Sequence, residues 1–142
     1  MLKLLTLPFL VLWLAAPGAP VEKEVPAAYR KMKNSLKPTA GLIDQARDIV
    51  YQQHCSYCHG AAGKGDGGKL EVSAGRAIPN FTTPEFAKHS DQWIFWRISE
   101  GVADTKMSAH KNVLSEKERW TLVLLVRSFN QKKAESRGKA KS

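Results

Sequence analysis

The sequence predicts an all-α domain in which three helices and long loops surround something other than their own side chains. Three stretches carry apolar residues at helical spacing, at residues 40–54, 91–100 and 115–129, and no stretch shows a persuasive strand pattern. Three helices joined by long loops form a thin core for about ninety residues, because loops bury little contiguous apolar area. Another group is therefore expected to fill the middle.

The first helix is predicted from Ala40 to His54. Thr39 is expected to be its N-cap after Pro38, and the helix leads directly into Cys55. The segment that begins at residue 60, GAAGKGDGG, has five glycines in nine residues and is predicted to be a loop that wraps a flat object.

The second helix is predicted in DQWIFWRISE, residues 91–100, with Ser90 as N-cap and Gly101 after its end. Its aromatic side chains, which include Trp93 and Trp96, suit either a core or the wall of a large planar ligand.

The third helix is predicted to begin with Ser115 and Glu118 at capping-box spacing and to end at Phe129. The segment after it, QKKAESRGKAKS, offers no apolar face to bury and is expected to be disordered.

Four segments follow from these patterns: a signal peptide at residues 1–18, a charged N-terminal extension at 19–38, the folded domain at 39–130 and a basic disordered tail at 131–142. The apolar run Leu4–Ala16 has the length of the hydrophobic region of an export signal and is short for a membrane span. An uncleaved anchor is the alternative, and in both cases the domain is expected outside the cytoplasm.

The net charge of +9 lies mainly in the flanks of the chain. Residues 39–130 contain eleven basic and ten acidic side chains, whereas residues 131–142 contain five basic and one acidic. A nucleic-acid binder usually carries a basic stripe on its folded surface, and an exported protein meets little nucleic acid. Nucleic acid is therefore excluded as a partner.

The stretch CSYCH, residues 55–59, holds the only two cysteines of the chain. A thioredoxin-like pair would need a helix N-terminus in a βαβ context, and a structural zinc site would need a fourth ligand at a recognisable spacing. Covalent attachment of haem uses Cys55, Cys58 and His59 together, and CxxCH is a signal for it. Haem c is therefore the predicted cofactor, attached through two thioethers.

The order of the motifs resembles a class I monohaem cytochrome c. CSYCHGAAGKGDGG is followed by IPNF, by ISEG with a methionine six residues after its glycine, and by a last helix that contains ERW. The resemblance spans about Gly41 to Phe129.

This resemblance implies a cytochrome c fold in which the first and last helices cross beside one haem. It implies that His59 and Met107 ligate the iron and that the Pro79 carbonyl accepts a hydrogen bond from the His59 imidazole. Arg47 stands where the family commonly has glycine at the crossing, so the crossing is expected to shift to Ala46.

Ser108 stands where the family often has a proline after the distal methionine. The alternative to Met107 is His110, three residues further on, or an open coordination site.

The function implied is one-electron transfer between redox proteins by an exported, periplasmic cytochrome that is a monomer or a complex subunit, and that is not itself an enzyme. One alternative is the haem subunit of a membrane-bound oxidoreductase complex, and the other is a small haem peroxidase or ligand-binding protein with an open distal site. Membrane contact would be made through residues 4–16 or through the basic tail.

Overall fold

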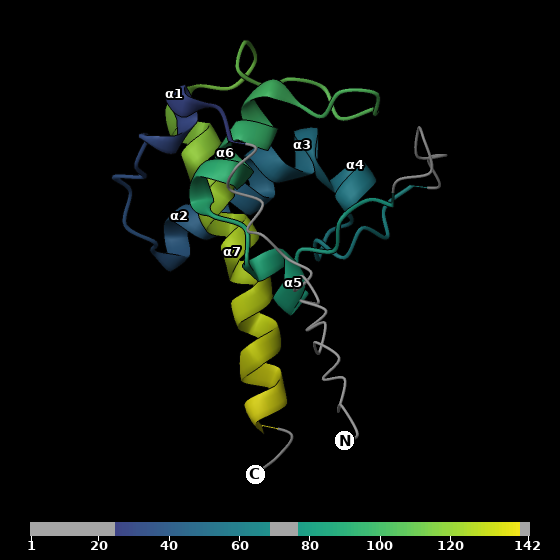
Figure 1. The fold of residues 1–142 in the computed structure, drawn as a ribbon. Coiled ribbons are helices and arrows are strands. Elements are labelled where there is room, and N and C mark those ends of the chain that lie inside the picture. Colours follow the sequence, from purple (N-terminus) through teal and green to yellow (C-terminus); the bar gives the residue numbers. More distant parts are fainter. Residues whose placement is uncertain (1–24, 69–76, 140–142) are drawn as a thin grey trace, which may run out of the picture.

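The computed structural model describes residues 25–68 and 77–139, and Figure 1 shows their arrangement. Within these ranges no strand occurs, which confirms the predicted all-α class. The elements in chain order are α1 (Ala27–Arg30), α2 (Ala40–Gln45), the π-helical segment η2 (Ala46–Tyr51), α3 (Gln52–His54), α4 (Ser56–His59), α5 (Pro84–Ala87), α6 (Asp91–Glu100) and α7 (Glu116–Lys139).

The predicted helix from Ala40 to His54 is present, but its centre is the wider π-helical turn of η2. The Thr39 side chain caps its start by accepting a hydrogen bond from the Leu42 amide at 3.3 Å, as predicted. Ala46 is only 1% exposed and belongs to the core. The Arg47 guanidinium lies over the ring of Phe129 on α7, 5.2 Å from its centroid.

The core forms where α7 packs against η2 and against α6. Phe95 of α6 stacks on Trp120 of α7 with ring centroids 3.9 Å apart, and Tyr51 of η2 meets Phe129 at 5.4 Å. Such aromatic pairs bury large apolar areas and add about 0.5–1.5 kcal/mol beyond burial. These contacts hold η2 and α6 against the long helix α7.

Both ends of the domain extend beyond the predicted boundaries of 39 and 130. Residues 25–38, predicted as an extension, pack on the core: Val25 is 2% exposed, and the Asn34 amide donates to the Trp120 carbonyl at 3.2 Å. The apolar residues Val25, Tyr29 and Leu36 explain this, because their burial stabilises the segment on the domain. We call residues 25–38 the strap.

The helix predicted to end at Phe129 continues to Lys139, so most of the tail predicted as disordered is helical. Figure 1 shows this part of α7 projecting away from the other helices. Lysine, arginine, glutamate, glutamine and alanine all have high helix propensity, and extending a helix that tertiary packing has already nucleated costs little. A buried apolar face is therefore not needed for these residues.

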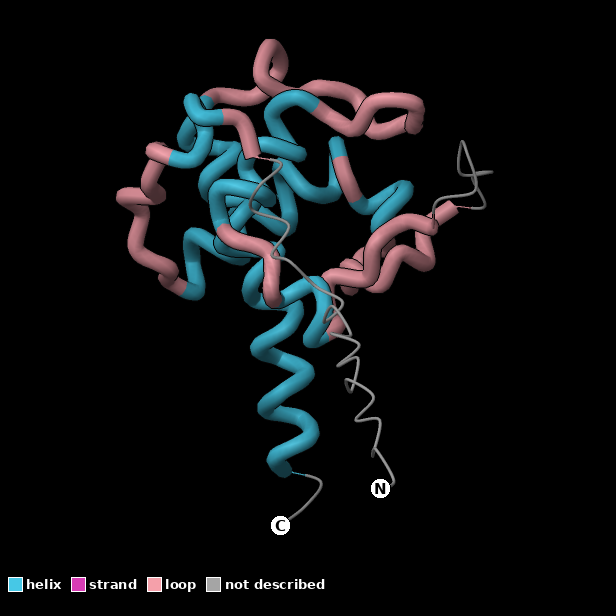
Figure 2. The backbone as a smooth tube through the Cα atoms, in the orientation of Figure 1, coloured by secondary structure: helices cyan, strands magenta, loops and turns pink. Residues whose placement is uncertain are grey.

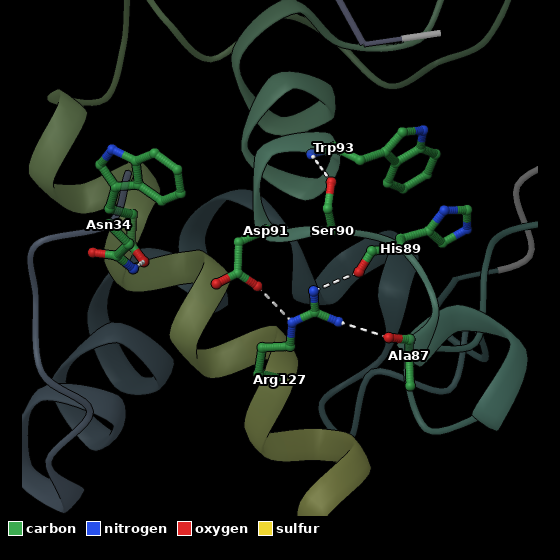
Figure 3. Close-up of polar contacts among 8 residues, drawn as sticks. Asn34, Ala87, His89, Ser90, Asp91, Trp93 and Arg127 are labelled. Atoms are coloured by element: carbon green, nitrogen blue, oxygen red, sulfur yellow. Dashed lines mark hydrogen bonds and ion pairs between the residues drawn. The ribbon is translucent and has the colours of Figure 1, made fainter. Parts of the chain in front are cut away.

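The connection between α5 and α6 is fastened to α7 by one arginine (Figure 3). The Arg127 guanidinium donates to the Asp91 carboxylate at 2.7 Å and to the backbone carbonyls of Ala87 and His89. Because three acceptors share one planar donor group, α6 starts at a fixed place on α7. The side chain of Ser90 accepts from the Trp93 amide at 3.2 Å, which confirms the predicted N-cap.

Long loops connect the helices and lie on several sides of them, as Figure 2 shows. The Ser115 and Glu118 side chains and amides form the predicted capping box at the start of α7. No helix within residues 25–68 and 77–139 is long and apolar enough to cross a membrane. The predicted signal at residues 1–18 lies outside the described residues.

The chain reverses sharply at Gly101, where α6 ends. Gly101 has a φ of +71°, and a β-carbon at this position would lie 2.3 Å from the Met107 carbonyl oxygen. That carbonyl accepts a hydrogen bond from the Val102 amide at 3.0 Å, so the loop closes tightly on itself. Only glycine combines this backbone conformation with so close an approach.

We expect Gly101→Ala to lower the free energy of unfolding by about 2 kcal/mol or more, because it adds a steric overlap and an unfavourable φ. Gly41→Ala is the matched control, since a β-carbon at Gly41 meets no atom within 4 Å. Guanidinium denaturation followed by tryptophan fluorescence measures both. Equal stability of the two variants would show that the reversal at Gly101 tolerates a side chain.

Candidate haem-binding site

A cavity of about 300 Å³ opens between α3–α4, α6 and the loop after Gly101. This volume lies at the lower end of the range of about 300–1,000 Å³ for ligand pockets. The five residues predicted from the sequence all line it: Cys55, Cys58, His59, Pro79 and Met107. The fold therefore brings together side chains that are up to 52 positions apart in the sequence.

The CSYCH stretch forms a helical turn at the end of α3. Cys55 takes its position from a hydrogen bond of its amide to the Tyr51 carbonyl at 2.9 Å, and its own carbonyl accepts from the His59 amide at 2.9 Å. Both cysteines are free thiols. Burial, with a smaller contribution from Cys58, raises the pKa of Cys55 to about 12, so this thiol is protonated at neutral pH.

The protonated state of Cys55 argues against a redox-active pair. Such a pair works through an accessible thiolate whose pKa is lowered by its surroundings. Two thiols on one turn, both facing the same cavity as His59, suit thioether bonds to a ligand that lies in that cavity.

The glycine-rich segment lies directly against this turn. The Gly65 amide donates to the His59 carbonyl at 2.9 Å, and the Phe81 amide donates to the Gly63 carbonyl at 2.8 Å. A β-carbon at Gly67 would lie 2.2 Å from the Tyr57 carbonyl oxygen, so the two backbones are in contact. The predicted loop thus wraps the CSYCH turn itself. Residues 69–76, which follow this segment, lie outside the described residues.

His59 is held in the cavity by stacking on Phe81, with ring centroids 4.7 Å apart. Burial, and to a lesser extent the nearby His110, lowers the pKa of His59 to about 4. The imidazole is therefore neutral at pH 7 and has one ring nitrogen with a free lone pair, which is the form that binds a metal.

The predicted hydrogen bond between His59 and Pro79 is absent. His59 Nδ1 is buried and has no hydrogen-bond partner among the described residues. The Pro79 carbonyl lies instead against Gly65, where an added β-carbon would come within 3.2 Å of its oxygen. Packing of this loop on the glycine-rich segment sets the direction of the carbonyl, although Pro79 itself lines the cavity.

The loop between α6 and α7 brings Met107 to the cavity. Its amide donates to the Thr105 hydroxyl at 3.1 Å, and its side chain is half-buried at the cavity. His110, the rival ligand, lines the same cavity and has a buried Nδ1 without a partner in the described part of the chain. Both candidate distal ligands are therefore in place.

The remaining lining residues fit a haem. Apolar side chains form most of the wall, and these include Phe81, Phe86, Ile94, Ile98 and Val126. Trp93 also lines the cavity, and its buried indole N–H has no hydrogen-bond partner in residues 25–68 and 77–139. An unpaired buried donor beside Arg97, which lines the same cavity, suits a planar apolar group that carries carboxylates.

Some lining residues were not predicted. His54 is exposed, yet it also lines the cavity, and its ring lies 6.0 Å from that of His110. Ile94 and Ile98 are four residues apart on α6, and this spacing could have identified them as one wall. Trp96 was considered as a wall residue but is not among the residues that line the cavity.

Comparison with known proteins identifies a family and similar solved structures. Residues 43–126 match the family described as cytochrome c oxidase, cbb3-type, subunit III. A chain of the Kuenenia stuttgartiensis reducing HAO-like protein complex Kustc0457/Kustc0458 is similar, with a TM-score of 0.57 and 31% identity over 66% of this chain and 46% of that chain. The present chain thus spans less than half of that longer chain.

A second structure, the KustC0563 c-type cytochrome, has a TM-score of 0.48 and 36% identity over 56% of this chain and 92% of its own length. None of the curated proteins compared matches the chain. Because the family match covers more than half of the sequence, the chain belongs to the family of c-type cytochrome domains described as cytochrome c oxidase, cbb3-type, subunit III.

Proposed function

We propose that the protein is an exported carrier of single electrons that would hold one haem c through Cys55 and Cys58, with His59 and Met107 as ligands of the iron. The observation that carries this proposal is the cavity: two thiols, a neutral imidazole and a thioether line one largely apolar space. The bound haem would supply a one-electron iron couple.

The side chains at the cavity suit electron transfer better than catalysis. A thioether is a soft, neutral donor that favours the reduced iron and raises the reduction potential. If His59 and Met107 both bind the iron, no coordination site would be left for a substrate. The apolar walls exclude water, which raises the potential further.

The apolar N-terminal run supports export, and the distribution of charge indicates which segments would attract redox partners. The apolar run Leu4–Ala16 suits a signal for the periplasm, where haem can be attached to an exported chain. Residues 39–130 are nearly charge-neutral, so encounters with redox partners would be steered mainly by the basic segments outside this range. Such encounters usually bury small, transient interfaces.

A second candidate function is a haem subunit fixed in an oxidoreductase complex. One similar structure is that of a protein complex, and the region similar to the present protein makes up 46% of the chain in that complex. The family is also described by a subunit of an oxidase. In this case residues 4–16 or the basic tail would hold the chain at the membrane.

The ligand assignment is tested by spectra and potentiometry of the purified holoprotein. Met107→Ala should abolish the weak far-red band of ferric haem bound by methionine sulfur and lower the reduction potential by on the order of 100 mV, because the soft donor is lost. His110→Ala is the matched control and should retain both properties.

A wild-type spectrum without the far-red band, altered by His110→Ala and not by Met107→Ala, would instead make His110 the ligand. Binding of carbon monoxide to the reduced wild-type protein at neutral pH would indicate an open site and favour a catalytic or ligand-binding role.

The two candidate functions differ in where the full-length chain is found after expression. A carrier should appear in the soluble periplasmic extract with a new N-terminus after Gly18, since the signal has been removed. A fixed subunit should stay with the membrane fraction. Variants that lack residues 131–142, or that replace their basic residues with glutamine, would then show whether the tail is what holds it.

A further inference from the structure

The loop that carries Met107 is hydrogen-bonded to the last turn of α6. The Ile98 carbonyl accepts the amide of His110 at 3.1 Å, and the Ser99 carbonyl accepts the amide of Lys111 at 3.1 Å. The loop therefore leaves α6 at Gly101 and returns to the same turn ten residues later. Movement of Met107 away from the cavity would therefore strain these hydrogen bonds.

The side chain of Glu100 connects this turn to the loop and to the strap. Its carboxylate accepts a hydrogen bond from the Lys111 ammonium at 2.7 Å and another from the Tyr29 hydroxyl. Hydrogen bonds from Lys111 and Tyr29 lower the pKa of Glu100, which keeps the carboxylate charged at neutral pH. Lys111 belongs to the returning end of the loop, and Tyr29 belongs to the strap.

The strap lies outside the part of the chain that matches the family, which begins at residue 43. Even so, it is packed firmly on α6, beside which α1 lies in Figure 1. Tyr29 packs on Phe95 with ring centroids 6.1 Å apart, and the Gln92 amide donates to the Met32 carbonyl at 2.8 Å. The Tyr29 hydroxyl is thus presented to Glu100 from a fixed support.

We propose that the strap braces the distal loop: Tyr29, acting through Glu100 and Lys111, is a positioning residue that keeps the loop closed with Met107 at the cavity. The proposal rests on the proposed function, in which Met107 is an iron ligand. Without the Tyr29 hydroxyl, Glu100 and Lys111 become a single exposed ion pair, which contributes little on its own. The loop would then open more often and admit competing ligands.

The test is the affinity of the ferric holoprotein for imidazole at a fixed neutral pH, read as loss of the far-red methionine band. Tyr29→Phe keeps the ring on Phe95 and removes only the hydroxyl, so imidazole should bind about threefold more tightly. In an E100Q background the same change should have little further effect, because the path through Glu100 is already weakened. Arg30→Gln, an exposed position of the same strap, is the control and should not change the affinity.

Four results would overturn the proposal. Unchanged imidazole affinity in Tyr29→Phe would show that the strap does not hold the loop, and an equal shift in Arg30→Gln would show that any change in the strap has the same effect. If Tyr29→Phe lowers the denaturation midpoint without changing imidazole affinity, its role is only structural. A wild-type protein with no methionine band would overturn the ligand assignment as well, and thereby separates failure of the proposed function from failure of the brace.

Discussion

The packing of α7 against η2 and α6 determines where both sides of the cavity lie. Tyr51 meets Phe129 in this layer and also donates a hydrogen bond to the Gly60 carbonyl at 2.8 Å, directly after the CSYCH turn. Phe95 stacks on Trp120 in the same layer, and the helix that carries it ends at the loop of Met107. Because both sides of the cavity are attached to the same aromatic layer, the two thiols and the Met107 thioether keep fixed positions relative to one another.

The elements that sequence reasoning predicted are those with local chemical signals. Helical periodicity identified the helices, side-chain caps identified the starts at Thr39 and Ser90, and glycine identified the end of the second helix at Gly101. Ligand candidates could be named because cysteine is rare in the chain and methionine has only three positions. The prediction that these residues lie together depended on the family resemblance, because spacing in the sequence does not show which distant residues come into contact.

The features that were missed depend on tertiary contacts. The strap was predicted to be a charged extension because its apolar residues are scattered in the sequence. In the fold these residues pack against the hydrophobic core, a contact that the sequence alone does not reveal. The continuation of α7 to Lys139 is set by nucleation within the core. The hydrogen bond expected at Pro79 is absent because a carbonyl direction depends on loop packing against Gly65, which no sequence pattern encodes.

The central claim is that the cavity holds one haem bound covalently through Cys55 and Cys58. The most direct test is the intact mass of the purified, denatured protein, because a thioether-bound group survives unfolding whereas an axially ligated one does not. We expect a mass that exceeds the polypeptide by one haem in the wild type and by none in the Cys55→Ala/Cys58→Ala variant. A wild-type mass equal to that of the polypeptide alone, from cells able to attach haem c, would contradict it.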